Sequence, residues 1–448
     1  MRVELVSPTW TEETSKARAE TAKVFKIPPL GLLNVAAITP KGVEVSLTDE
    51  NVEPVNFDCS PDLVGITVMT ASAPRAYQIA DRFRELGVPV VLGGPHVTFL
   101  PEEASLHADA AVLGEAEGCW QKLVEDFQKK GKRGLKKFYK NDEKPDMSTV
   151  PLPRVDLLKG GKHIVTNVLH ITRGCPYNCA FCSVTRLFGQ KLRFRRVEQV
   201  VEFVEKNRGN SLNGRFFGFT DDNIMANHSY ARKLFQALVP YRIIWASQTS
   251  VNAAYDTQLL RLAKRSGCIA VFLGLESLSA ASLAEMNKPQ NKVEFYQEAI
   301  KRFHYYGMFV EGAFIFGFDR DERDVFARTV EFANRVKLDA VQYTIATPLP
   351  GTAFYETLEK QGRIIDRDWA NYDCLHAVFR PRNMTPEELE EGLVWAYENT
   401  YSLPSVFKRV TGIFTGGRAK YLFPLLIFNL GYRNTIPKRR TSQQAVSY

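Results

Sequence analysis

Short apolar runs alternate with amphipathic stretches over the first third of the chain. The strand-like runs span residues 3–6, 43–48, 63–68, 90–92 and 110–113. Apolar residues recur at helical spacing in the segments between them, residues 30–38, 75–86 and 120–129. Strands that are separated by helices predict a parallel sheet, so we expect a doubly wound, Rossmann-like α/β domain over residues 1–135.

A second alternating block follows. Its candidate strands span residues 164–171, 216–220, 243–246, 270–273, 310–316 and 340–345, and its candidate helices span 197–206, 229–238, 257–266, 292–306 and 322–336. This succession of β/α repeats predicts a (β/α)6 partial barrel over residues 161–384.

The segments outside these two blocks differ in pattern. Residues 136–160 are rich in Lys, Gly, Asp and Pro and predict a linker. From Thr385 the pattern becomes helical, with a good N-cap residue followed by Pro386 in the first turn. We therefore expect a helical cap and a basic tail over residues 385–448, and the cap is a candidate lid over the barrel.

The net charge of +8 is concentrated at the carboxyl end of the chain. No Asp or Glu occurs between residues 403 and 448, where the basic residues are Lys408, Arg409, Arg418, Lys420, Arg433, Lys438, Arg439 and Arg440. The rest of the chain is therefore near neutral, which argues against nucleic acid as a partner.

The apolar run at residues 421–428 lies among these cations and is too short to span a bilayer. It is interpreted either as a peripheral membrane contact or as a helix that packs on the barrel and has a solvated basic end. The chain starts with a strand-like run rather than a secretory leader, so we expect a cytoplasmic protein, with the tail allowing contact with the inner membrane face.

Three of the seven cysteines crowd into eight residues. Cys175, Cys179 and Cys182 directly follow the first strand of the second block, at the end where barrels place their chemistry. Thiolates are soft ligands, and three of them can hold three irons of a cubane and leave the fourth iron open. The alternative is a zinc site with His170 as its fourth ligand. The other four, which we expect to be small buried hydrophobic residues, are Cys59, Cys119, Cys268 and Cys374.

Residues 173–182 resemble the signature of the radical S-adenosylmethionine (SAM) superfamily. The segments 219–223, 274–277, 312–317 and 347–352 resemble further motifs of that superfamily, in order, at the strand ends. The resemblance implies a [4Fe–4S] cluster on the three cysteines, SAM at the open iron and a 5′-deoxyadenosyl radical. The residues that it implies for SAM binding are Phe181, Asp221, Glu276, Gly312 and Gly317.

The first block resembles the cobalamin-binding domain of one branch of this superfamily, through the segments 28–32, 64–67, 93–96 and 114–117. The cobalamin contacts that this resemblance implies are Leu30, Gly31, Thr67, Thr70, Gly93, Gly94, Gly114, Glu115 and Glu117. The loop at residues 7–12 lacks the histidine with which related domains bind cobalt, so we expect no histidine on the metal. His96 is interpreted as a turn residue near the groove. The alternative for the first block as a whole is a domain that keeps this fold but does not bind cobalamin.

The resemblance implies methylation of an unactivated carbon. The apolar run and the cations of the tail lead us to expect a hydrophobic, lipid-like small molecule as the substrate. A reductase, flavodoxin or ferredoxin would supply electrons. Ring closure or carbon–carbon coupling with the same cofactors is an alternative. A methylthiotransferase acting on RNA is disfavoured, because only Cys59 and Cys119 precede the barrel. An alternative that is not an enzyme is an iron–sulfur protein that only carries electrons.

Overall fold

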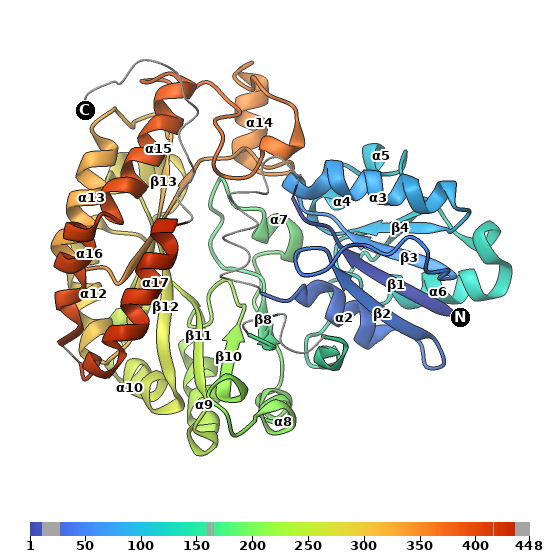
Figure 1. The fold of residues 1–448 in the computed structure, drawn as a ribbon, viewed down its shortest axis with the longest axis horizontal. Helices are drawn as coiled ribbons and strands as arrows, with labels where there is room; N and C mark the ends of the chain where they lie inside the picture. Colours follow the sequence, from blue (N-terminus) through green and yellow to red (C-terminus); the bar gives the residue numbers. More distant parts are fainter. Residues whose placement is uncertain (11–26, 159–162, 164, 415, 435–448) are drawn as a thin grey trace.

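The computed structural model describes residues 1–10, 27–158, 163, 165–414 and 416–434 (Figure 1). Two α/β units lie side by side, and the carboxyl-terminal helices cover the side of the second unit that faces away from the first. The predicted α/β fold class is confirmed. Part of the loop at residues 7–12 and the tail residues Lys438, Arg439 and Arg440 lie outside the described residues.

The first unit is built on a six-stranded sheet of order β2-β1-β3-β4-β5-β6, in which all neighbours are parallel. Its strands are β1 (Arg2–Ser7), β2 (Glu44–Asp49), β3 (Leu63–Thr67), β4 (Val90–Gly93), β5 (Ala110–Leu113) and β6 (Phe138–Lys140). Helices α2 (Leu30–Ile38) and α6 (Cys119–Lys130) share one apolar core with the sheet, and α3 (Ala73–Glu85) shares the other. The sheet is therefore doubly wound, as predicted.

The predicted boundary at residue 135 is wrong by one strand. Strand β6 falls in the predicted linker, but it pairs with β5, with Phe138 opposite Ala111. Only Tyr139 of β6 is buried, so a three-residue edge strand among lysines carries too little apolar pattern to be recognised. The first unit thus continues to at least Lys140.

The second unit carries six parallel strands in chain order. They are β7 (Asn167–Leu169), β10 (Phe216–Phe219), β11 (Ile244–Thr249), β12 (Cys268–Glu276), β13 (Phe309–Phe316) and β14 (Ala340–Ile345). In the described part of the chain β14 does not pair with β7, so the barrel is partial, as predicted. The outer helices are α8 (Val197–Asn207), α9 (His228–Leu238), α10 (Thr257–Ser266), α12 (Tyr296–Tyr305) and α13 (Val325–Val336).

Strand β7 is shorter than the predicted strand at residues 164–171. The chain turns after Leu169, and β8 (Thr172–Arg173) pairs antiparallel with β9 (Arg193–Phe194). The reason is Asp221, whose carboxylate accepts the backbone N–H groups of Ile171 and Thr172 at 3.2 and 2.5 Å. A side chain from the next β/α loop thus replaces a strand partner.

Alternation along β13 defines the two faces of the barrel. Phe314 and Phe316 pack on Phe332 and Phe326 of α13, so their side chains face the outer helices. Successive side chains of a strand point to opposite faces, so the intervening residues, which include Glu311 and Ile315, face the concave interior.

The helical region predicted after Thr385 is confirmed. It forms α15 (Pro386–Thr400), which begins at a capping box between Thr385 and Glu388, then α16 (Leu403–Val410) and α17 (Leu422–Asn434). No helix among the described residues has the length and apolar character needed to cross a membrane.

Tyr397 of α15 and Tyr401, the residue that caps the end of this helix, protect the free edge of β14. The Tyr397 hydroxyl accepts the N–H of Tyr343 at 3.0 Å and donates to its carbonyl at 2.8 Å. Tyr401 does the same with Val341, at 3.0 and 2.7 Å. An unpaired edge strand otherwise presents backbone groups to any passing strand. Helix α15 therefore closes this side of the barrel without a seventh strand.

Two cations of the basic tail are internal rather than solvated. Arg418 is fully buried and bonds the carboxylate of Asp339 at 2.7 Å. Arg409 is also buried and donates to the carbonyls of Leu338 and Thr400. One interpretation of the tail was a packed helix whose basic end is solvated. For Arg409 and Arg418 the predicted solvation is wrong.

The four scattered cysteines divide into two pairs. Cys119 and Cys268 are buried, as predicted. The prediction is wrong for Cys59 and Cys374, which are only partly buried. Cys59 lies in the irregular segment before β3, where its thiol donates to the carbonyl of Asn56 at 2.8 Å, and Cys374 has a left-handed backbone. Neither lies on a regular element whose apolar face would bury it.

We predict that Tyr401→Phe lowers the free energy of unfolding by about 1–3 kcal/mol, because the N–H and carbonyl of Val341 lose their partner in a buried place. Denaturant unfolding followed by circular dichroism measures this change. Tyr305→Phe, on an exposed side chain, is the matched control and should leave the unfolding curve unchanged. Equal curves for the two variants would contradict the edge-protection role.

Candidate functional site

The three clustered cysteines lie on one loop between β8 and α7 (Val184–Phe188), at the carboxyl end of β7. Gly174 starts this loop in a left-handed conformation (φ +92°), and a Cβ there would lie 2.4 Å from the carbonyl oxygen of Lys191. Only glycine therefore fits at the position before Cys175.

Main-chain hydrogen bonds on both sides hold the middle of this loop. The N–H of Ala180 donates to the carbonyl of Met286 at 2.9 Å, and the carbonyl of Ala180 accepts the N–H of Phe354, also at 2.9 Å. Met286 follows α11 (Ala280–Glu285) and Phe354 lies in α14 (Ala353–Lys360). Backbone from two distant β/α units thus fixes the cysteine loop.

The chemistry of the three thiols fits a cubane. Burial raises the pKa of each thiol above its ordinary value, to about 12 for Cys182. Iron binding would take the place of the proton, because a coordinating thiol is deprotonated outright. No three His, Cys, Asp or Glu side chains of the described chain converge on a single ion. Three thiolates that each bind a different iron suit a cubane whose fourth iron is open.

The residues predicted to bind SAM divide into two groups. Glu276 ends β12 in a left-handed conformation (φ +65°), Phe181 lies on the cysteine loop, and Gly317 follows β13 with φ +100°. The Phe181 ring lies 6.4 Å from that of Phe318, which follows Gly317. These three positions therefore sit at the strand ends around the cysteines.

The structure gives the other two predicted SAM residues different roles. Asp221 is fully buried, and its carboxylate already accepts two N–H groups of the segment that leads to the cysteines. A Cβ on Gly312 would lie 2.7 Å from Leu338, so this glycine faces the outer packing. The neighbour Asp222, which the sequence analysis did not single out, keeps a buried carboxylate oxygen that has no hydrogen-bond partner among the residues the structure describes, and burial raises its pKa to about 6.

A second group that sequence reasoning missed is the segment of residues 287–291, after α11. Its Lys288 forms an ion pair with Glu276, and its Asn291 donates to the carbonyls of Gly274 and Leu275 at 2.8 and 3.0 Å. The sequence feature that could have identified this segment is a polar run with a central proline directly after a helix, Asn-Lys-Pro-Gln-Asn.

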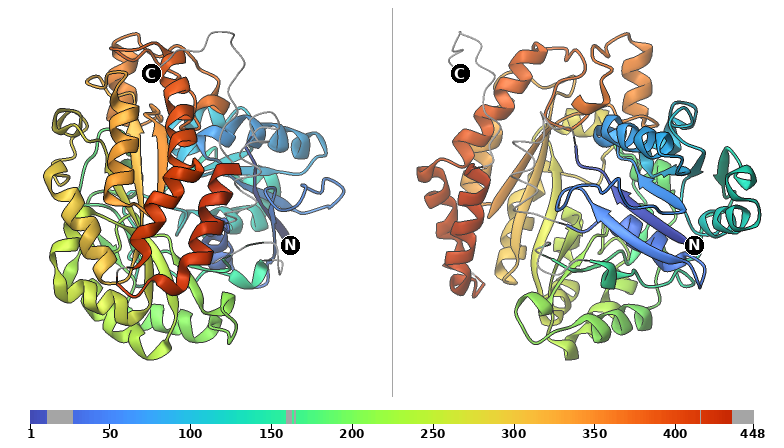
Figure 2. Two further views of the ribbon diagram at one scale, coloured as in Figure 1. Left: turned by 60° about the vertical axis from the view of Figure 1, so that its left-hand side comes forward. Right: turned by 45° about the vertical axis from the view of Figure 1, so that its right-hand side comes forward.

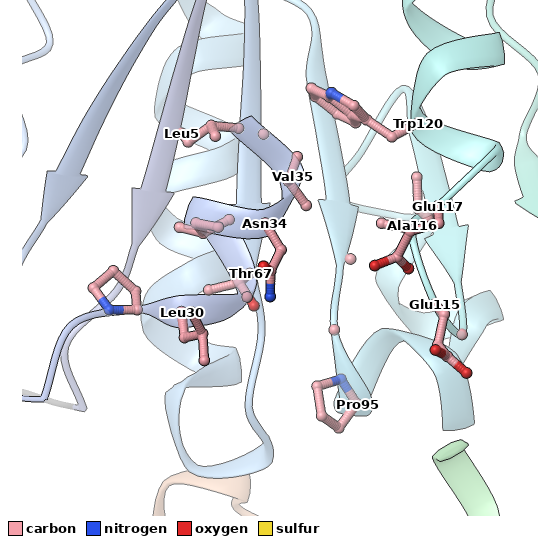
Figure 3. A pocket seen from close by; sticks show the side chains of 18 of the residues that line it. Leu5, Leu30, Asn34, Val35, Thr67, Pro95, Glu115, Ala116, Glu117 and Trp120 are labelled. Carbon is pink, nitrogen blue, oxygen red and sulfur yellow. The ribbon is translucent and has the colours of Figure 1, made fainter. Parts of the chain in front are cut away.

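A cavity of about 430 Å³ opens at the carboxyl ends of β1, β3, β4 and β5 and extends to the barrel (Figure 3). Its lining includes all of the predicted cobalamin contacts except Thr70, which is buried at the start of a short helix. The lining residues that the sequence analysis missed include Asn34, Trp120, His170, Phe188 and Thr220.

The cavity wall fits an apolar ring that carries amide groups, as cobalamin does. Asn34 Oδ1, His170 Nε2 and Thr220 Oγ1 are buried in this wall and lack hydrogen-bond partners among the described residues. Burial lowers the pKa of His170 to about 3, with help from nearby arginines, so its imidazole is neutral. A Cβ on Gly94 (φ +105°) would lie 2.9 Å from the backbone of Val68, which explains the glycine there.

His96 does not line the cavity. Its ring is fully buried in α4 (Pro95–Phe99), and its Nε2 lies 3.2 Å from Glu103 Oε1. The indole N–H of Trp369, from the segment after α14, donates to the same carboxylate at 3.0 Å. The interpretation of His96 as a turn residue is wrong, because it lies in the short helix α4, whose side-chain partner Glu103 contacts the second unit through Trp369.

Two predicted cobalamin contacts also join the two units. Arg173 of β8 donates to Glu115 at 2.6 Å and to Glu117 at 2.7 Å, and Arg193 donates to Glu115 at 2.7 Å. All four side chains are largely buried. Burial by itself would raise the pKa of Glu117, but Arg173 outweighs it and holds that pKa below its ordinary value. Glu115 and Glu117 thus line the cavity while fastening it to the barrel.

Comparison with known families agrees with this geometry. The B12-binding domain matches residues 21–124, and the radical SAM superfamily matches residues 169–333. Bacteriochlorophyllide d C-12(1)-methyltransferase of Chlorobaculum tepidum is 31% identical, over 86% of this chain and 85% of that protein. The chain therefore belongs to the cobalamin-binding branch of the radical SAM enzymes.

One further relative and one solved structure are also similar to this chain. The anaerobic magnesium-protoporphyrin IX monomethyl ester cyclase of Cereibacter sphaeroides is 26% identical, over 82% of this chain and 64% of that protein. The structure of the cobalamin-dependent SAM radical enzyme OxsB, with aqua-cobalamin and SAM bound, has a TM-score of 0.70 at 16% identity and covers 97% of this chain and 71% of OxsB. The latter similarity confirms the predicted two-unit fold.

We predict that Arg173→Lys destabilises the junction by about 2–5 kcal/mol, because lysine cannot reach both carboxylates and leaves one buried charge unpaired. Thermal unfolding and proteolysis of the segment between the units measure this effect. Arg186→Lys, on an exposed arginine of α7, should behave as the wild type.

The loss of stability in Arg173→Lys should depend on pH. The pKa of Glu117 is lowered on folding, so its ion pair stabilises the protein above the ordinary glutamate pKa and is lost on acidification below it. The difference between wild type and Arg173→Lys should therefore shrink in acid. A difference that stays constant down to acid pH would contradict the ion-pair explanation.

Proposed function

We propose that this protein methylates an unactivated carbon of a hydrophobic small molecule, using SAM, a [4Fe–4S] cluster and cobalamin. The observation that carries the proposal is the shared wall of the two sites. Arg173 lines the cobalamin cavity and lies two residues before Cys175, so both cofactors would contact one short stretch of chain. The bound cofactors supply the radical and the methyl group.

The chain's own residues bind, orient and shield these groups. Cys175, Cys179 and Cys182 hold the cluster, and Glu276 and Phe181 lie where SAM would meet its open iron. The cavity residues Asn34, His170 and Thr220 take the amide groups of cobalamin. A low-potential one-electron donor, which is a reductase, a flavodoxin or a ferredoxin, reduces the cluster.

The concave face of the barrel supports a hydrophobic substrate. The partly exposed side chains on this face are mostly apolar, as Ile244, Phe272 and Ile315 show. Glu311 is a carboxyl group among them, and it accepts the hydroxyl of Tyr432 at 2.5 Å. Burial raises the pKa of Glu311, and a carboxyl in such surroundings suits a polar group on an otherwise apolar substrate.

Ring closure or carbon–carbon coupling is the second candidate, and the cyclase relative favours it. Product mass separates the two reactions, since methylation adds CH₂ and oxidative cyclisation removes H₂. A non-catalytic electron carrier would release no 5′-deoxyadenosine from SAM after reduction.

The surface of α16 and α17 supports peripheral contact with the inner face of the cytoplasmic membrane. Helices α16 and α17 lie on the outside of the second unit (Figure 2, left). On them, Phe407, Phe423 and Ile427 are 75%, 72% and 55% exposed. The exposed cations Lys408, Lys420 and Arg433 accompany them, and the sequence places no acidic residue after residue 402. Exposed apolar side chains ringed by cations match an anionic lipid surface.

We predict that the anaerobically reconstituted protein holds about four irons and about one cobalamin per chain. Cys175→Ala should lose the cluster and all release of 5′-deoxyadenosine, while Cys268→Ala, in the buried core, should keep both. Elemental analysis, visible spectra and mass spectrometry measure these quantities. Zinc in place of iron would overturn the proposal, and iron without cobalt would overturn methyl transfer.

We further predict that the protein sediments with vesicles of phosphatidylglycerol and phosphatidylcholine, and that Phe423→Ser with Ile427→Ser weakens this binding at least tenfold. Leu106→Ser, at an exposed leucine of the first unit, is the control and should bind as the wild type. Binding that is equal in all three proteins, or equal on purely zwitterionic vesicles, would exclude this surface as the membrane contact.

A further inference from the structure

The segment of residues 287–291 connects the cysteine loop to the end of β12. On the cysteine side, Asn287 Nδ2 donates to the carbonyl of Asn178 at 2.7 Å, and Gln290 Nε2 lies 3.8 Å from Cys179 Sγ. On the strand side, Asn291 Nδ2 bonds the carbonyls beside Glu276. The segment therefore contacts both the cysteine loop and the end of the strand that carries Glu276.

Lys288 is the charged residue at the centre of the segment. Its side chain is largely buried, and its ammonium is paired with the carboxylate of Glu276. The same ammonium lies 5.8 Å from the centroid of the Phe181 ring, on the loop that carries the cysteines, directly before Cys182. One cation thus faces both the carboxylate predicted to bind SAM and the cysteine loop.

The backbone is shaped to form this ion pair. Glu276 adopts a left-handed conformation that is unfavourable for a residue with a side chain. A Cβ on Gly274 would collide with the Glu276 carboxylate and would lie 3.0 Å from Lys288 Nζ. The missing side chain at Gly274 and the left-handed backbone of Glu276 together allow the Glu276 carboxylate to lie against Lys288.

This pairing has an electrostatic consequence for the cluster. Reduction adds one electron to a cluster that three thiolates already make negative, so a nearby cation favours the reduced form. While Lys288 is paired with Glu276, the two charges cancel and their effect on the cluster is small. The amino group of SAM would compete with Lys288 for the same carboxylate.

We propose that Lys288 couples SAM binding to reduction of the cluster. In the SAM-free protein Glu276 neutralises Lys288. When SAM occupies Glu276, the lysine charge is released toward the cysteine loop and stabilises the reduced cluster. The external one-electron donor supplies the electron, and no covalent bond forms or breaks in this step. The inference rests on the proposed cluster and SAM site but is independent of the substrate and of methyl transfer.

The test is a redox titration of the reconstituted protein, followed by electron paramagnetic resonance with and without SAM. In the wild type, SAM should shift the reduction potential upward. In Lys288→Met the shift should fall by at least half, whereas the SAM-free potential should change less. Because coupling is reciprocal, the ratio of SAM affinities for the reduced and oxidised protein should fall as well.

Two further variants separate this role from a structural one. Lys288→Arg keeps the charge and should restore the shift, and Lys292→Met removes an exposed charge four residues away and should behave as the wild type. An undiminished shift in Lys288→Met, or an equal loss in Lys288→Arg, would overturn the inference. Protein that holds no iron in any form would instead contradict the proposed function.

Discussion

The ion pairs of Arg173 with Glu115 and Glu117 are the constraint on which the site depends. Three charges are withdrawn from water at the junction of the two units, and each is satisfied only when the units are in contact. Arg173 also belongs to β8, directly before the cysteine loop. The same residue therefore fixes the position of the first unit and the entry of the chain into the cluster site. Arg173 is therefore part of both the lining of the candidate cobalamin cavity and the segment that leads to the cysteines.

The sequence predicted the parts of the fold that depend on repeated local pattern. Alternating strands and helices identified both units, and the cysteine triplet was placed correctly at a strand end because its spacing is local. Strand β6 could not be found, because a three-residue edge strand among lysines has almost no apolar period. The truncation of β7 could not be found either, since it is caused by Asp221, some 50 residues further along the chain.

The candidate site was predictable in position but not in the role of each side chain. Glu115 and Glu117, predicted as cobalamin contacts, line the cavity, but their arginine partner Arg173 lies more than 55 residues away and left no local signal in the sequence. Gly312 resembles a ligand-binding glycine, yet it faces the outer helices. Its strand is apolar on both faces, so alternation in the sequence does not distinguish the concave interior from the core.

The two hydrogen bonds of Ala180 determine how the cluster site comes into being. Backbone groups of Met286 and Phe354 hold the middle of the cysteine loop, so hydrogen bonds to the surrounding barrel help to fix its shape without involving iron. In small metal domains, by contrast, the ion itself drives folding. A loop that is held in this way is suited to accept a cubane that has been assembled beforehand. Loss of the cluster to oxygen would then leave a folded protein that can be reloaded.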